Sequence, residues 1–119
     1  MTAVPRDAGR ILLVSANRER QPYPVVPNGV ACVAAALREA GHDVRVLDLC
    51  FERSPLRAAR AAVNGWSPDV IGLSVRNIDN SDAIALRHYT PEAAQVMAAL
   101  REAAPHATII AGGAAFGVA

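Results

Sequence analysis

Four short apolar segments, separated by segments with helical spacing, most constrain what this chain can fold into. They lie at residues 11–15 (ILLVS), 44–49 (VRVLDL), 70–75 (VIGLSV) and 108–111 (TIIA), and each has the length of a strand. The first and third are continuously apolar, which is typical of strands covered on both faces, whereas the second alternates and predicts a more polar face. Strands that alternate with helices predict right-handed βαβ crossovers and a parallel sheet.

The segments between these strands begin and end as helices do. The first, residues 28–40, is followed by Gly41, which favours a helix stop. The second starts at Ser54 as the N-cap, with Pro55 in its first turn. The third opens with Thr-Pro-Glu at residues 90–92, which places an acid near the positive end of the helix dipole. The predicted apolar faces are, in chain order, Val30, Val33 and Leu37; Leu56, Ala59 and Val63; and Val96, Met97 and Leu100.

This pattern predicts an α/β, Rossmann-like fold of the flavodoxin type, with about four strands and three helices and the strand order 2-1-3-4. Binding loops are expected beyond the carboxyl ends of the strands. The first helix then lies alone on its face of the sheet and leaves that face half bare. Doubly wound domains normally continue with a further helix, strand and helix. We therefore expect residues 1–119 to be one domain truncated at its C-terminus, or a domain whose bare face a partner covers; a minimal four-stranded domain is the alternative.

Composition excludes several classes of protein. The 119 residues are 52% apolar and 19% charged, which is typical of a globular domain. A net charge of +1 with dispersed arginines predicts no nucleic-acid partner. Residues 1–10 do not form a signal peptide and no apolar run has membrane-span length, so no membrane partner and a cytoplasmic location are expected. Two cysteines, Cys32 and Cys50, are too few for a zinc or iron–sulfur site, and we expect both to be buried and reduced.

The topology sorts the histidines before any motif is considered. His42 and His106 precede strands and are expected on the surface at the edge opposite the binding loops. His88 lies on the ligand side, but late in a long loop. No G-x-G-x-x-G follows the first strand, no P-loop motif occurs, and no Ser or Cys nucleophile has a nearby His base in the sequence. The sequence therefore predicts neither catalytic residues nor protein ligands to a metal.

Three stretches at the ligand edge are unusual. Residues 16–27 (ANRERQPYPVVP) are proline-rich, and prolines lower the cost of ordering a loop around a ligand. Residues 75–89 crowd polar side chains at the end of the third strand, which favours recognition of a polar ligand. Gly112 and Gly113 follow the fourth strand and permit close approach to the backbone. The alternatives are a surface connector, local turn chemistry and a tight turn, respectively.

Together these stretches resemble the N-terminal cobalamin-binding domain of B12-dependent radical SAM proteins, over residues 10–118. The resemblance is carried by ILLVSANRERQPYPVVPNG, AAALREAGHDVRVLDL, SPDVIGLSVRNIDN and TIIAGGAAFGV. Its most specific parts are P-Y-P-x-x-P-x-G, R-N-I-D-N and G-G-x-x-F. The cofactor-binding residues that it implies are Asn17, Tyr23, Pro24, Ser74, Arg76, Asn77, Asp79, Asn80, Gly112, Gly113 and Phe116.

The chain departs from the wider B12-binding class at one motif. That class carries D-x-H-x-x-G after strand one, S-x-L at strand three and G-G after strand four. Ser74 stands at the second motif, followed by Val75 and Arg76, and the glycine pair stands at the third, but the first motif is missing and its loop has no histidine. The resemblance then implies cobalamin bound base-off, with its dimethylbenzimidazole tail away from cobalt and no histidine beneath the metal.

The resemblance also implies a role for each segment. The glycine pair would let the nucleotide tail pass close to the backbone, and Ser74 would donate a hydrogen bond to it. Arg76, Asn77 and Asn80 would bond the corrin amides or occupy the lower face of the cobalt. Because the C-x-x-x-C-x-x-C motif is absent, the 4Fe-4S cluster and SAM are expected only in a C-terminal radical SAM domain, which is the expected partner.

The chain alone is therefore expected to be a cobalamin-binding module of a methyltransferase-like radical SAM enzyme. Two other readings stay open. One is the nucleotide-sugar-binding half of a Rossmann-like transferase, which fits the alternating elements but leaves R-N-I-D-N and the proline loop unexplained. The other is a non-catalytic interaction domain whose bare sheet face docks on a partner.

Overall fold

The computed structural model describes residues 8–18, 27–75 and 89–112 of the chain. They form a four-stranded parallel sheet in the order β2-β1-β3-β4, so the predicted order is confirmed. The strand ends differ from the predicted ones by no more than one residue. The elements are β1 (Arg10–Ser15), α1 (Asn28–Glu39), β2 (Asp43–Asp48), α2 (Pro55–Val63), β3 (Val70–Ser74), α3 (Tyr89–Ala103) and β4 (Thr108–Gly112).

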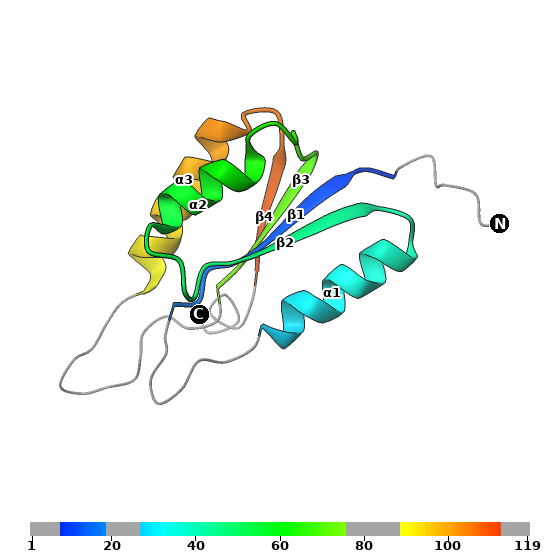
Figure 1. Cartoon of the computed structure of the whole chain (residues 1–119), viewed down its shortest axis with the longest axis horizontal. Helices are drawn as coiled ribbons and strands as arrows, with labels where there is room; N and C mark the ends of the chain where they lie inside the picture. Colours follow the sequence, from blue (N-terminus) through cyan, green and yellow to red (C-terminus); the bar gives the residue numbers. More distant parts are fainter. Residues whose placement is uncertain (1–7, 19–26, 76–88, 113–119) are drawn as a thin grey trace.

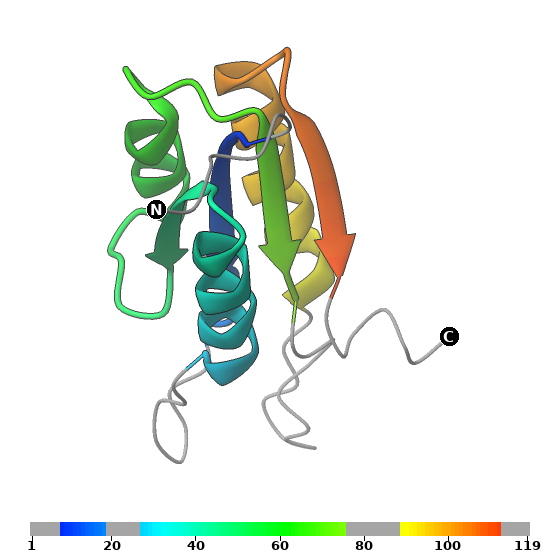
Figure 2. The same ribbon diagram turned by 90° about the vertical axis from the view of Figure 1, so that its right-hand side faces the viewer.

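The two faces of the sheet are covered unequally. Helices α2 and α3 lie side by side on one face. On the other face α1 packs on the sheet, and no second described helix lies beside it (Figure 1). In Figure 2, α1 crosses in front of the sheet and leaves β3 and β4 in view. The half-bare face expected from the sequence is therefore present in the described part of the chain.

The larger core lies between the sheet and the α2–α3 pair. It combines Leu12 and Leu73 from the strands with Ala59 of α2 and with Val96 and Leu100 of α3, all of them buried. The apolar faces predicted for α2 and α3 thus pack where the spacing of their residues placed them. Most of the apolar burial that stabilises the domain is on this side.

The second core, under α1, is small. Its buried members are Ile11, Leu13, Val30, Ala34 and Val44, from β1, β2 and α1. The helix packs on β1 and β2, and none of the described residues lies over β3 and β4 on this face. The smaller core therefore stabilises only one half of the α1 face.

Local signals in the sequence account for the ends of the first two helices. The Ser54 hydroxyl accepts a hydrogen bond from the backbone N–H of Arg57 at 3.3 Å, with Pro55 at the first helical position, as predicted. Gly41 has a φ of 99° and ends α1, because this left-handed conformation costs glycine little. The Gly41 and His42 N–H groups then bond to carbonyls of the last turn of α1.

Two expectations need correction. Cys32 is exposed, whereas Cys50 is buried as predicted, and the two do not form a disulfide. Cys32 lies two positions from both Val30 and Ala34, which places it on the opposite side of α1. His42 lies at the expected edge, but it is half buried and its Nδ1 accepts a hydrogen bond from the Gly9 N–H at 3.1 Å. No helix among the described residues has the length and hydropathy needed to cross a membrane.

We predict that Ser54→Ala lowers the free energy of unfolding by about 1 kcal/mol, because the first turn of α2 loses its cap. Urea denaturation followed by circular dichroism measures the change. The matched control is Ser54→Asp, which retains an acceptor for the Arg57 N–H and should stay close to the parent. Equal losses in both variants would show that the cap does not stabilise α2.

Candidate functional site

The carboxyl edge of the sheet carries a row of four aligned residues. In the strand register Ser15 pairs with Asp48 and with Ser74, and Ser74 pairs with Gly112. All four belong to the same face of the sheet, because neighbouring residues in register point the same way. Two members of this row, Ser74 and Gly112, line the same groove as Gly29 and Val30 in the first turn of α1.

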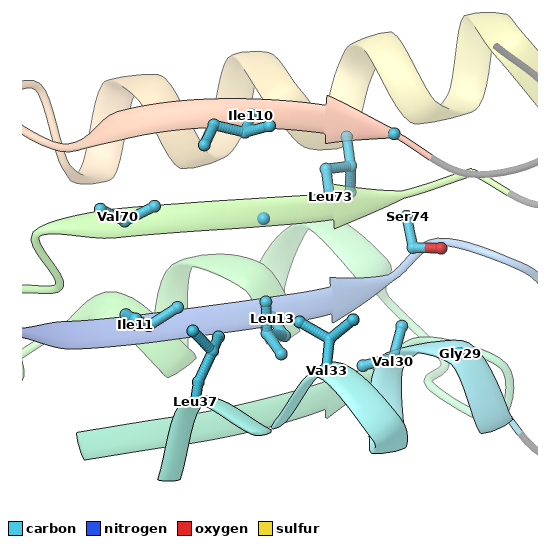
Figure 3. A pocket seen from close by; sticks show the side chains of 12 residues that line it. Ile11, Leu13, Gly29, Val30, Val33, Leu37, Val70, Leu73, Ser74 and Ile110 are labelled. Carbon is cyan, nitrogen blue, oxygen red and sulfur yellow. The ribbon is translucent and has the colours of Figure 1, made fainter. Parts of the chain in front are cut away.

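A groove with a volume of about 510 Å³ runs along this face between α1 and strands β1, β3 and β4. Figure 3 shows the lining residues: α1 forms one wall, and the strands form the floor. The described lining residues are apolar apart from one serine, and they are Ile11, Leu13, Gly29, Val30, Val33, Leu37, Val70, Gly72, Leu73, Ser74, Ile110 and Gly112.

The groove is deepened by small residues on the strands that form its floor, which are Gly72 and Ser74 on β3 and Gly112 on β4. Gly72 pairs in register with Leu13 on one side and with Ile110 on the other. Ser74 and Gly112 form the next row towards the carboxyl edge. Because side chains alternate between the two faces of a strand, Gly72 and Ser74 both face α1 while the intervening Leu73 is buried in the larger core.

The glycines of the groove differ in what a side chain would meet there. A Cβ on Gly72 would lie 2.8 Å from Leu13 Cδ2, so Leu13 occupies the space that Gly72 leaves. A Cβ on Gly29 or on Gly112 would meet no atom of the described residues within 4 Å. At these two positions the groove is open down to the backbone, and a ligand can approach the first turn of α1 and the end of β4 closely.

The groove exists because α1 covers only part of its face of the sheet, and only some of its apolar side chains pack against the strands. Val30 and Ala34 are buried against the sheet, whereas Val33 is 50% exposed. Ile110 on β4 is 59% exposed on the same face. These two side chains stand on either side of the groove, so apolar surface is presented to whatever enters it.

Beyond the carboxyl edge, two described segments carry further features. Arg18 Nε lies 3.4 Å from Glu92 Oε1, and this ion pair joins the segment after β1 to the first turn of α3. Asn17 precedes it and is half buried. Phe51, in the turn that follows β2, is 64% exposed. The described residues at this edge therefore combine a paired charge with an exposed aromatic ring.

Of the site residues predicted from the sequence, three are described. Asn17 follows β1, Ser74 lines the groove at its carboxyl end, and Gly112 is the last residue of β4 rather than part of a loop. Ser74 and Gly112 are brought together by register. The other predicted site residues, and His88, lie outside the described residues: Tyr23, Pro24, Arg76, Asn77, Asp79, Asn80, Gly113 and Phe116.

The sequence did not predict that α1 forms a wall of the groove or that Gly72 lies at the centre of its floor. Val33 was assigned to a packed helix face, Gly29 entered only as the last position of P-Y-P-x-x-P-x-G, and Gly72 was not singled out. A signal was present for Gly72, since it lies two positions before Ser74 and must share its face. Among the described residues, no group of three His, Cys, Asp or Glu side chains is arranged to hold a metal ion. The apolar lining of the groove is suited to binding an organic ligand.

Three comparisons give the relatives of this chain. The model of the family described as the B12 binding domain matches residues 15–119. A structure of the radical S-adenosylmethionine methyltransferase TsrM from Kitasatospora setae, with cobalamin and a 4Fe-4S cluster bound, aligns with a TM-score of 0.79 at 28% identity. A second TsrM structure, with tryptophan substrate and the SAM analog aza-SAM bound, aligns with a TM-score of 0.77 at 30% identity. No curated protein sequence matches the chain significantly.

The aligned regions cover most of this chain and little of its neighbours. They span 89% and 87% of this chain, but 20% and 19% of the TsrM chains. The cobalamin-dependent S-adenosylmethionine radical enzyme OxsB, solved with aqua-cobalamin and S-adenosylmethionine bound, aligns over 90% of this chain and 14% of its own, at 17% identity and a TM-score of 0.60. That likeness concerns the fold alone. The family resemblance identified from the sequence is confirmed.

We predict that Ile110→Ala lowers the free energy of unfolding by only about 1 kcal/mol, because its side chain is mostly exposed beside the groove. Ile71→Ala is the matched comparison, since Ile71 is fully buried in the larger core and its truncation should cost about 3 to 5 kcal/mol. Chemical denaturation of both variants measures the difference. Equal losses would show that the face over β4 is covered in solution.

Proposed function

The chain belongs to the B12 binding domain family, and we propose that it binds cobalamin along the α1 face and carboxyl edge of its sheet. The observation that carries the proposal is the apolar groove, which opens beside the small-residue row of Ser74 and Gly112. Its volume of about 510 Å³ lies within the roughly 300 to 1,000 Å³ that is usual for small-molecule sites. The similarity to a methyltransferase solved with cobalamin supports the same ligand.

The groove residues fit the nucleotide tail of the cofactor. A flat aromatic base is matched by the aliphatic walls of Val33 and Ile110, and its burial there is favourable. At Gly29 and Gly112 the ribose and phosphate of the tail can pass without meeting a Cβ. We assign to Ser74 a hydrogen bond that its hydroxyl donates to the tail.

We assign the corrin ring to the loops beyond the carboxyl edge. Asn17 and Tyr23 with Pro24 follow β1 in the sequence, and Gly113 with Phe116 follows β4. The polar residues Arg76, Asn77, Asp79 and Asn80 follow β3 and offer donors and acceptors for the corrin amides. These assignments rest on the family resemblance and on the position of each residue in the chain.

We propose that cobalamin is bound base-off and without a histidine beneath cobalt. The segment of residues 16–27 contains no histidine. His42 belongs to the turn before β2 and His106 to the turn before β4, at the opposite edge of the sheet. In this arrangement the tail occupies the groove, and Arg76 is the residue that we assign to the lower face of the metal.

The chain spans about a fifth of the methyltransferases with which it aligns. We propose that residues 1–119 are the cofactor-binding domain of a longer radical SAM enzyme, whose other domain holds the 4Fe-4S cluster and SAM. When bound, cobalamin would supply a cobalt centre that carries a methyl group. The residues of this chain bind and orient the cofactor, exclude water from its tail and perform no bond-breaking step themselves.

Titration of the 119-residue chain with hydroxocobalamin tests this proposal. We predict that the corrin is retained through gel filtration and that its visible spectrum is that of the base-off form. Electron paramagnetic resonance of the Co(II) state reads the lower ligand directly, because a coordinating nitrogen splits the cobalt signal. Folded chain that retains no corrin would contradict the proposal. A base-off spectrum that is unchanged in Arg76→Ala would remove Arg76 from the cobalt.

Gly29→Ala separates folding from binding. We predict that it raises the free energy of unfolding by up to about 1 kcal/mol, since alanine favours the helix and meets no neighbour. The added methyl group should weaken hydroxocobalamin binding by roughly fivefold or more, because it narrows the groove that the tail enters. Absorbance titration measures the affinity.

The matched control for Gly29→Ala is Cys32→Ala, on the exposed side of α1 and outside the groove. It also raises helix propensity and should leave the affinity unchanged. If Gly29→Ala binds hydroxocobalamin as tightly as this control does, the ligand does not approach the first turn of α1.

A further inference from the structure

The groove is graded along its length from a polar end to an entirely apolar interior. Ser74 and Gly29 lie at the carboxyl end, whereas Ile11, Leu37 and Val70 lie at the far end (Figure 3). Of the lining residues that the structure describes, Ser74 alone has a polar side-chain atom. A ligand that fits this grading has a polar part at the carboxyl end and an apolar part inside.

The backbone groups of β1, β3 and the middle of α1 add no hydrogen-bonding atoms to the apolar interior of the groove. Strand β3 is paired with β1 on one side and with β4 on the other, and β1 is paired with β2 and β3. Their N–H and C=O groups are therefore used in the sheet and lie in its plane rather than pointing into the groove. The middle of α1, at Val33 and Leu37, likewise uses its backbone groups within the helix. Among the described residues, the interior of the groove therefore presents neither donors nor acceptors.

We propose that this groove discriminates among cobamides by the base at the end of the nucleotide tail, taking a benzimidazole-type base in preference to a purine. Cobamides share the corrin ring and differ in this base. The inference rests on the proposed binding of cobalamin and names the class of corrinoid that the site accepts.

The discrimination follows from the polar atoms of the two bases. A dimethylbenzimidazole has a methylated apolar edge and a single unsubstituted ring nitrogen. Adenine adds further ring nitrogens and an amino group around its edge. Each polar atom that is buried without a partner lowers affinity by roughly five- to a hundredfold. The purine is therefore expected to bind more weakly, because the interior of the groove offers its polar atoms no hydrogen-bond partners. The methyl groups gain contact with Leu37 and Val70 instead.

Affinities of the 119-residue chain for cobalamin, an adenine-containing cobamide and cobinamide, which lacks the nucleotide tail, test the proposal. Absorbance titration gives each dissociation constant. Cobalamin is expected to bind at least about tenfold more tightly than the adenine cobamide, and cobinamide is expected to be weaker than cobalamin.

Two valines provide a matched pair of variants. Val33 lines the groove and is 50% exposed, whereas Val46 on β2 is 41% exposed and lies outside it. Val33→Thr places a hydroxyl in the groove with almost no change of shape. It is expected to weaken cobalamin binding and to reduce the preference over the adenine cobamide by several-fold, and Val46→Thr is expected to leave both unchanged.

The outcomes separate this inference from the proposed function. Equal affinity for the two cobamides, or equal effects of the two valine variants, overturns the discrimination while cobalamin binding stands. Cobinamide that binds as tightly as cobalamin shows that the tail does not use the groove, which also overturns it. If none of the three corrinoids binds the folded chain, the proposed function itself fails and the inference fails with it.

Discussion

The width of a single helix determines how this domain divides its surface. An α-helix with its side chains is about 10 Å across and strands lie about 4.8 Å apart, so one helix covers about two strands. Helix α1 is the one described helix on its face of a four-stranded sheet, and it covers β1 and β2. The groove over β3 and β4 follows from this mismatch, whereas two helices, α2 and α3, lie side by side on the opposite face (Figure 1).

The unequal cover separates stability from binding. The larger core, on the α2–α3 side, contains the fully buried side chains of Leu12, Ile71 and Leu100, and losing any of them would cost several kcal/mol. On the other face, Val33 and Ile110 remain exposed and contribute little to folding. Residues that fold the chain and residues that line the groove therefore alternate along the same strand, as the buried Ile71 does between Val70 and Gly72. A substitution in the groove can change binding without unfolding the domain.

The sequence predicts the fold well because its signals are local. Each strand is a short apolar run, Ser54 and Pro55 mark a helix start, and the handedness of βαβ units leaves few strand orders. The groove is less predictable, because it depends on register: Gly72 forms its floor only when paired between Leu13 and Ile110, which are remote in the sequence. Cys32 was misplaced for a related reason, since composition gives no information on which side of α1 packs. The predicted corrin-binding residues on residues 76–88 stay predictions, because they lie outside the described part of the chain.

An amphipathic ligand suits this face better than a purely apolar one. The row that includes Ser74 and Gly112 is the point where the sheet ends, so polar groups placed there keep access to solvent. A few residues further in, Ile11 and Val70 offer only carbon atoms. A ligand with a polar stem and an apolar tip can meet both conditions in one orientation and not in the reverse one. The grading of the groove therefore favours a single orientation of the ligand that we propose for it.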